Sequence, residues 1–172
     1  MKKIKFLYRI SFWFCLWLTR ATHLNGVLVV AFREVNGKIE VLIINKRLGP
    51  PGTCGWHLPG GGINHKLEPR EQAKIELKEE SGIEISEQLR IVDQFRGPVP
   101  ESKRFNLCTL WVVKVISQSE PKPSGGIEIK EAKFVDLKEL GSWIPETELN
   151  YTVKAVARYS LLQQRVLSSS RD

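Results

Sequence analysis

The stretch that decides the fold of this chain is GGGINHKLEPREQAKIELKEESGI, residues 60–83. It begins with Gly60, Gly61 and Gly62, continues as a helical pattern and closes at Gly82. Proline in the first turn and glycine after the last turn are preferred helix boundaries, so the pattern predicts a helix over residues 69–81. Glycines before a helix allow the backbone to approach a phosphate or a metal ion closely. We therefore expect a ligand site where the glycines meet the helix.

The predicted helix carries three glutamates, Glu76, Glu79 and Glu80, at spacing i, i+3 and i+4. This spacing places them on one face, where like charges repel one another. A cation between them removes the repulsion, and several carboxylate oxygens suit Mg²⁺ or Mn²⁺. A solvated face of Glu/Lys pairs is the alternative, and the helix alone leaves both interpretations open. The preceding glycines favour the metal site, although no G-K-[ST] follows them, so the stretch is not a P-loop.

The segments on either side of this stretch predict a single α/β domain. Two β-rich runs, 27–32 and 39–45, flank Asn36-Gly37, the strongest short hairpin signal. Residues 89–97 and 105–117 are expected to form further strands, the second nearly all apolar and hence central in a sheet. Residues 127–140 alternate and then turn helical, and residues 147–166 have helical periodicity. Strands mixed with two substantial helices indicate an α/β fold.

The N-terminal arm, residues 1–24, differs in composition from the rest of the chain. It holds five basic residues and no acid, whereas the whole chain has a net charge of +7. A helical wheel predicts an amphipathic helix, basic on one side and apolar on the other. Three interpretations stay open: packing on the domain, contact of residues 1–22 with an anionic membrane surface, and a cleaved signal. The apolar run 10–18 is too short to span a bilayer.

Charge and cysteine content narrow the functional classes. Because the rest of the chain is nearly neutral, we do not expect it to bind a nucleic-acid polymer, which requires a basic surface. The odd number of cysteines, Cys15, Cys54 and Cys108, fits no disulfide framework and predicts buried thiols in a reducing compartment. We expect a cytoplasmic protein, peripheral at the membrane if the arm binds lipid. Its predicted organisation is the arm, a domain over residues 25–167 and a disordered tail over residues 168–172; the oligomeric state stays open, with a dimer compatible.

The stretch resembles the box of the Nudix hydrolase family, G-x5-E-x7-R-E-U-x-E-E-x-G-U, in which U is a bulky apolar residue. In the ungapped register that starts at Gly61, the second half of the box is intact. Its E, U, E, E, G and U fall on Glu76, Leu77, Glu79, Glu80, Gly82 and Ile83. The flanking segments GWHLPGGG and EIKEAKFVDLKEL are also similar to the family, so the resemblance covers roughly residues 26–140.

The resemblance implies an α/β/α sandwich around a mixed sheet and metal-dependent hydrolysis of a diphosphate in a nucleoside diphosphate derivative. It implies that Glu76, Glu80 and the Gly61 carbonyl ligate Mg²⁺ or Mn²⁺, with Glu79 a ligand directly or through water. The metal would activate a water for attack on phosphorus. Catalytic roles are expected for Glu79 and Glu80. A further acid comes from a later loop, where Glu128 is our candidate.

Two further acids stand behind Glu128 as candidates, Glu131 and Glu101. For contacts with a base or ribose of a small-molecule nucleotide substrate, the sequence offers Arg96, Trp56 and Phe105. Aromatic residues in such strands also serve as core, so both roles stay open. Nucleoside diphosphate sugars including ADP-ribose, nucleoside triphosphates and dinucleoside polyphosphates all remain candidate substrates.

Two positions depart from the family pattern. Leu67 stands where the box has its first glutamate, and Ile75 where it has arginine. We hypothesise that the two side chains pack together where a charged pair would otherwise lie, since replacing both members of a buried pair is often neutral. Loss of such support typically lowers metal affinity or activity about 10–100-fold. One alternative to a hydrolase is therefore a catalytically weak or inactive Nudix-fold nucleotide-binding or scaffold protein. Another is a membrane-associated protein in which the N-terminal arm is the main functional element.

Overall fold

The computed structural model describes residues 24–48, 54–63, 66–85, 89–95, 105–116, 120–124 and 126–169. The predicted amphipathic helix of the N-terminal arm lies outside these residues, apart from Leu24 at its end. Arg96 and Glu101 also lie outside them. Within the described part of the chain, no helix combines the length and the apolar character needed to span a bilayer.

A β-hairpin forms the centre of the sheet. Strands β1 (Leu24–Val35) and β2 (Lys38–Lys46) pair antiparallel, with Val35 opposite Lys38. Asn36 and Gly37 connect them with φ values of 50° and 74°. Positive φ at both central residues is what a tight type I′ hairpin turn requires, and Asn-Gly supplies it with little strain. The predicted hairpin is confirmed.

The other strands extend this hairpin into a seven-stranded mixed sheet with the order β3-β2-β1-β6-β5, in which β4 also pairs with β1 and β7 with β2. Strand β6 runs parallel to β1, and the remaining pairs are antiparallel. Strand β6 lies between β1 and β5, as its apolar sequence predicts. The bounds are β3 Gly55–His57, β4 Gly60–Gly62, β5 Arg90–Phe95, β6 Phe105–Lys114 and β7 Ile129–Asp136.

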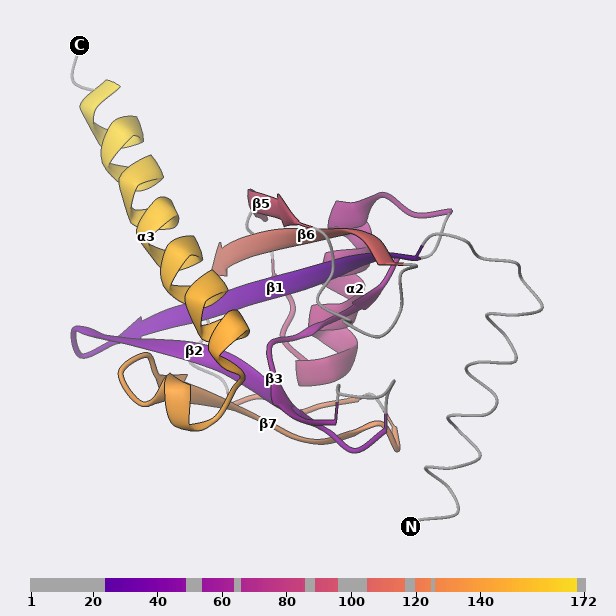
Figure 1. The fold of residues 1–172 in the computed structure, drawn as a ribbon. Helices are drawn as coiled ribbons and strands as arrows, with labels where there is room; N and C mark the ends of the chain where they lie inside the picture. Colours follow the sequence, from indigo (N-terminus) through magenta and orange to yellow (C-terminus); the bar gives the residue numbers. More distant parts are fainter. Residues whose placement is uncertain are drawn as a thin grey trace.

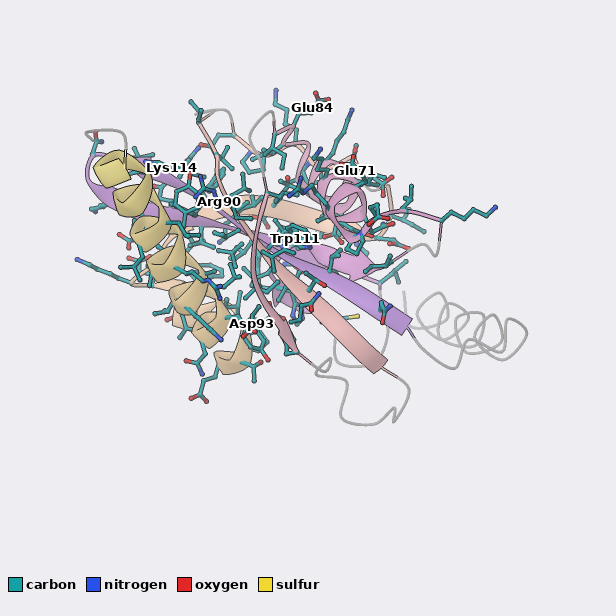
Figure 2. The ribbon with its side chains drawn as sticks, turned by 90° about the horizontal axis from the view of Figure 1, so that it is seen from above. Glu71, Glu84, Arg90, Asp93, Trp111 and Lys114 are labelled. Atoms are coloured by element: carbon teal, nitrogen blue, oxygen red, sulfur yellow. The ribbon has the colours of Figure 1, made fainter. Side chains whose placement is uncertain are left out.

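Two helices cover opposite faces of the sheet, as Figure 1 shows. Helix α2 (Pro69–Ser81) packs through Ala73 and Leu77 on one hydrophobic cluster. Helix α3 (Glu146–Ser169), which follows a short 3₁₀ helix η1 (Leu140–Ser142), packs through Ala155 and Val156 on the other. Figure 2 shows this arrangement from above, with Trp111 on the strands between the two helices. The predicted α/β/α sandwich is confirmed, and the predicted helix over residues 69–81 is observed with the same bounds.

The division of one edge of β1 between two partners positions the glycines. The second half of β1 pairs with β2, whereas its first half pairs with β4, where Val27 lies opposite Gly61. Strand β4 consists only of the glycines that precede α2. This pairing places the glycine backbone in the sheet beside α2, so the two halves of the stretch 60–83 meet.

Candidate active site

Helix α2 orients its three glutamates differently. Because Ala73 and Leu77 face the sheet, the last turn of the helix brings Glu80 inward, and only 7% of Glu80 is exposed. Glu76 is half-buried and Glu79 is exposed. A buried carboxylate needs compensation by hydrogen bonds or by positive charge. The environment of Glu80 therefore defines the site.

The backbone of Gly61 approaches the carboxylate of Glu76 closely. A Cβ atom at position 61 would lie 2.6 Å from Glu76 Oε1 and 2.8 Å from Oε2. Any residue other than glycine would therefore push this carboxylate away. The close approach brings a peptide group and a half-buried carboxylate into one small space, as the glycine-before-helix pattern predicts.

Lys46, at the end of β2, compensates the charge of Glu80. Its Nζ lies 2.7 Å from Glu80 Oε1 and donates a hydrogen bond of 2.5 Å to the Gly60 carbonyl oxygen. The Gly60 N–H donates to Glu80 Oε2 at 2.8 Å. The lysine, the glycine and the glutamate thus form a closed ring of contacts that joins β2, β4 and α2.

Sequence reasoning missed Lys46, although the strand pattern holds a signal for it. Side chains alternate along a strand, so Leu42, Ile44 and Lys46 lie on one face of β2. Leu42 belongs to the cluster under α2, and Ile44 is fully buried. A lysine that continues a buried apolar row is expected to have an anionic partner on the same side.

Burial dominates the electrostatics of the two inner glutamates. It raises the pKa of Glu80 to about 7, although Lys46 and the Gly60 N–H lower it. Burial also raises the pKa of Glu76, with the charges of Glu79 and Glu128 adding to the effect. Burial disfavours the charged form of a carboxyl group because it removes water from it. A cation bound beside these two carboxyl groups would therefore stabilise their charged form.

The segment before β7 contacts the C-terminal end of α2 and the end of β2. Ser124 N–H donates to the Glu79 carbonyl at 3.0 Å, and the Arg47 N–H donates to the Glu128 carbonyl at 2.7 Å. These contacts hold Glu128 where its charge acts on Glu76. Glu131 is exposed on β7 opposite Asn45. Of the three acids considered for the later loop, Glu128 has this electrostatic link to the site, and Glu101 lies outside the described residues.

The donors at the site fit a divalent metal, but they are held by other partners. Among the described residues, no three side chains of His, Cys, Asp or Glu are gathered as a ready metal cluster. Gln72 Nε2 donates to Glu76 Oε1 at 2.8 Å, and Lys46 holds Glu80. A hard divalent cation prefers oxygen ligands, and this site offers carboxylate and carbonyl oxygens close to the backbone of Gly61. An ammonium group already lies between two of these oxygens. The residue types present therefore fit a divalent cation, while Lys46 and Gln72 hold two of the carboxylates.

The two positions that depart from the family pattern are partly exposed. Leu67 is 36% exposed and Ile75 is 37% exposed. Contact between the two side chains stays a prediction. Their exposure does change the expected energetics, because a charged pair at such a surface contributes about 0–1 kcal/mol rather than the larger amount of a buried pair. We therefore expect that restoring charged residues at these two positions would change the stability of the fold little.

The substrate-contact candidates lie apart from the glutamates or outside the described side chains. Trp56 is on the α3 face, edge-on to Trp143 with ring centroids 5.4 Å apart. Lys133 lies over the Trp56 ring at 4.4 Å. Phe105 begins β6, but its side chain is outside the described part, as is Arg96. Their roles in binding stay predictions.

A second polar cluster, which the sequence did not indicate, ties β3 to α3. Glu148 accepts a hydrogen bond of 2.7 Å from the Leu58 N–H, and its other oxygen lies 2.8 Å from His57 Nδ1. Both side chains are largely buried, at 14% and 13% exposure. The contacts span 90 and 91 residues of sequence, so no local pattern could have paired these residues.

The cysteines differ from expectation in one respect. Cys54 and Cys108 are free thiols, and burial raises the pKa of Cys108 to about 12. Cys54, however, is exposed, so the expectation of a buried thiol is wrong for this residue. It lies directly before the short strand β3, at the surface, where the chain enters the sheet. Cys15 lies outside the described residues.

Comparisons with known proteins agree with this fold. The solved structures that it resembles include the NUDIX domain of Shewanella oneidensis NrtR complexed with ADP ribose (TM-score 0.68, 15% identity, 80% of this chain and 88% of that chain). A C. elegans Ap4A hydrolase binary complex matches with TM-score 0.65 and 20% identity, over 80% of this chain and 98% of that one. The MutT protein of Methanosarcina mazei Go1 matches with TM-score 0.62 and 19% identity, over 80% and 95%. At these identities the likeness establishes the fold.

No curated protein matches the sequence. The family model described as "NUDIX domain" matches residues 22–159, which include β1, the glycine strand, α2 and the first part of α3. This match spans well over half of the 172 residues. The chain therefore belongs to the NUDIX domain family.

Proposed function

We propose that this protein hydrolyses a diphosphate linkage in a nucleoside diphosphate derivative with the help of Mg²⁺ or Mn²⁺. One observation carries the proposal: the Gly61 backbone packs against the Glu76 carboxylate so closely that no Cβ fits, next to the buried carboxylate of Glu80. Carboxylate and carbonyl oxygens in one small space are the ligands that hard divalent cations prefer.

The residues divide into two roles. Glu76, Glu79, Glu80 and the carbonyl of Gly61 would hold the metal, which, when bound, neutralises phosphate oxygens and makes a nearby water more acidic. Glu128 is exposed and its charge acts on Glu76, and we assign it as the base. It takes a proton from the attacking water while the water oxygen bonds to phosphorus and the bridging P–O bond breaks. The phosphate released on the far side leaves as the anion.

The substrate class is supported by the structures that this fold resembles. One neighbour in fold was solved with ADP ribose, and another is an Ap4A hydrolase. We assign Trp56, Arg96 and Phe105 to the nucleoside part of a comparable ligand. The free thiols of Cys54 and Cys108 support a reducing compartment such as the cytoplasm. Peripheral membrane contact concerns residues 1–22 alone.

A second candidate is a nucleotide-binding module without turnover. The observation in its favour is that Lys46 and Gln72 hold the two inner glutamates, so that no metal cluster is ready among the described residues. Leu67 and Ile75, which stand where the family pattern has charged residues, also favour this second candidate. Binding of nucleotide without hydrolysis would distinguish this candidate from the first.

A hydrolysis screen tests both. The purified full chain is assayed with Mg²⁺ and with Mn²⁺ against nucleoside diphosphate sugars, nucleoside triphosphates and dinucleoside polyphosphates. Glu76→Gln and Glu80→Gln should each lower metal-dependent turnover at least about 100-fold, because they remove metal ligands rather than supporting residues. Glu131→Gln, an exposed glutamate on β7, is the matched control and should retain turnover. Nucleotide binding with no metal-dependent turnover of any compound would favour the second candidate.

A further inference from the structure

The ammonium of Lys46 lies between oxygen atoms of the kind that bind metal ions in proteins. Two kinds of oxygen ligand surround it, a carboxylate oxygen of Glu80 at 2.7 Å and the carbonyl oxygen of Gly60 at 2.5 Å. These are the ligand types that Mg²⁺ and Mn²⁺ take in proteins. Only 17% of the Lys46 side chain and 9% of the Glu80 side chain are exposed, so water does little to compensate either charge.

The backbone of Lys46 is fixed from both sides. In the sheet it lies opposite Gly55 of β3 and opposite Ile129 of β7. The flexible part is the four-carbon side chain, whose rotation can carry the ammonium away without movement of the strand. The geometry therefore combines a fixed anchor with a movable charge.

The charge of Lys46 reaches both inner glutamates. It contacts Glu80 directly, and it also acts electrostatically on Glu76. Removing one member of a buried ion pair leaves the other charge uncompensated, which is strongly unfavourable unless another cation replaces it. A divalent ion at Glu76 and Glu80 supplies that replacement and repels the ammonium at the same time.

We propose that Lys46 is the resident cation of this site: in the metal-free protein it holds Glu80 against Gly60, and a divalent metal ion displaces it from Glu80 on binding. This inference rests on the proposed metal-dependent function and deepens it, because it makes Lys46 a positioning residue that sets metal affinity.

Metal affinity distinguishes displacement from a purely structural role. Lys46→Met keeps the length of the side chain and removes its charge. If the metal must displace the ammonium, this variant should bind Mn²⁺ at least about 10-fold more tightly than the wild type, measured by electron paramagnetic resonance at pH 8, because no competitor remains. Its thermal midpoint in EDTA should fall and should recover when Mn²⁺ is added. Lys46→Arg retains the competing charge and should keep an affinity close to that of the wild type.

Lys38→Met is the matched control, since it removes one positive charge from the exposed start of the same strand. Its Mn²⁺ affinity should be unchanged. Equal or weaker Mn²⁺ binding by Lys46→Met would overturn the inference and leave the proposed hydrolase intact. Absence of Mn²⁺ binding in the wild type and in all variants would overturn the proposed function and this inference with it.

A second measurement uses the wild-type protein, so it does not depend on the folding of a variant. Brief acetylation followed by mass spectrometry reports how accessible each lysine amine is. Added Mg²⁺ should increase the labelling of Lys46 several-fold, because the released amine gains access to the reagent, while the labelling of Lys38 stays constant. No increase at Lys46 under conditions where Mg²⁺ raises the thermal midpoint would contradict displacement.

Discussion

Replacing the three glycines of β4 one at a time by alanine separates stability from metal binding. At Gly61, the added Cβ would lie 2.6 Å from Glu76 Oε1, the mobile end of a side chain. We expect the carboxylate to swing away at a cost to stability of about 1 kcal/mol or less. Removing a residue that only supports a metal ligand typically lowers metal affinity about 10–100-fold. Displacing the ligand Glu76 itself should lower Mn²⁺ affinity by at least as much.

The neighbouring glycines provide the contrast. At Gly60, φ is 156° and the Cβ would lie 2.3 Å from the carbonyl oxygen of Val27, so backbone must move and we expect a loss of about 2–5 kcal/mol. At Gly62, a Cβ meets nothing within 4 Å. Gly62→Ala should keep its metal affinity and gain up to about 1 kcal/mol, because alanine reduces the entropy of the unfolded chain.

The assay pairs urea unfolding in EDTA with Mn²⁺ titration of each variant. The expected pattern is a stable variant with impaired metal binding for Gly61→Ala, an unstable one for Gly60→Ala and a neutral one for Gly62→Ala. The reasoning is refuted if Gly61→Ala binds Mn²⁺ as the wild type does, or if Gly62→Ala loses as much affinity as Gly61→Ala. Either result would mean that the close approach to Glu76 does not define the site.

Four further outcomes are expected. The pKa of Glu80 is raised from 4.5 to about 7, so the folded state binds this proton more tightly than the unfolded state. The metal-free protein should therefore lose stability, by at most on the order of 3 kcal/mol, as pH rises from about 4.5 to 7. Urea unfolding at pH 5 and pH 8 should show this loss, and Glu80→Gln should remove most of it. For the same reason Mn²⁺ should bind more weakly below pH 7, because the metal competes with the proton on Glu80, and a titration series across pH measures this. Leu67→Glu and Ile75→Arg should each change stability by no more than about 0.5 kcal/mol, and additive effects in the double variant would argue against contact between the two side chains. Glu148→Gln should lose about 1–3 kcal/mol in urea unfolding while Mn²⁺ affinity stays constant, since its partner, the Leu58 N–H, belongs to a different cluster; altered Mn²⁺ affinity would show that the two clusters are coupled.

Local sequence was sufficient for the elements that build the site. The Asn36-Gly37 turn, the helix over residues 69–81 and the apolar strand β6 all follow from patterns within a few residues of one another. The glutamate spacing on α2 and the glycines before it indicated where chemistry would occur. The structure adds that Gly61 touches Glu76, which the pattern anticipated only as a close approach.

The tertiary structure alone decided what surrounds the glutamates. Lys46 reaches Glu80 because β2 and β4 both lie beside β1, and this depends on sheet register between segments far apart in sequence. Glu148 meets His57 across 91 residues because helix α3 lies against the sheet at β3. The pattern of β2 indicates that Lys46 needs an anionic partner, but it does not identify Glu80, since the spacing of residues along one element carries no information about the element packed against it.

Turn chemistry and periodicity act over short distances, so the helices, the strands and the residue types present at the site can be predicted from the sequence. The burial of Glu80 beside an ammonium, the exposure of Glu79 and the partly exposed positions of Leu67 and Ile75 depend instead on how distant segments pack together. Burial and partner charge set the pKa of Glu80 and the availability of its oxygens, and both are properties of how the sheet and the helix pack together.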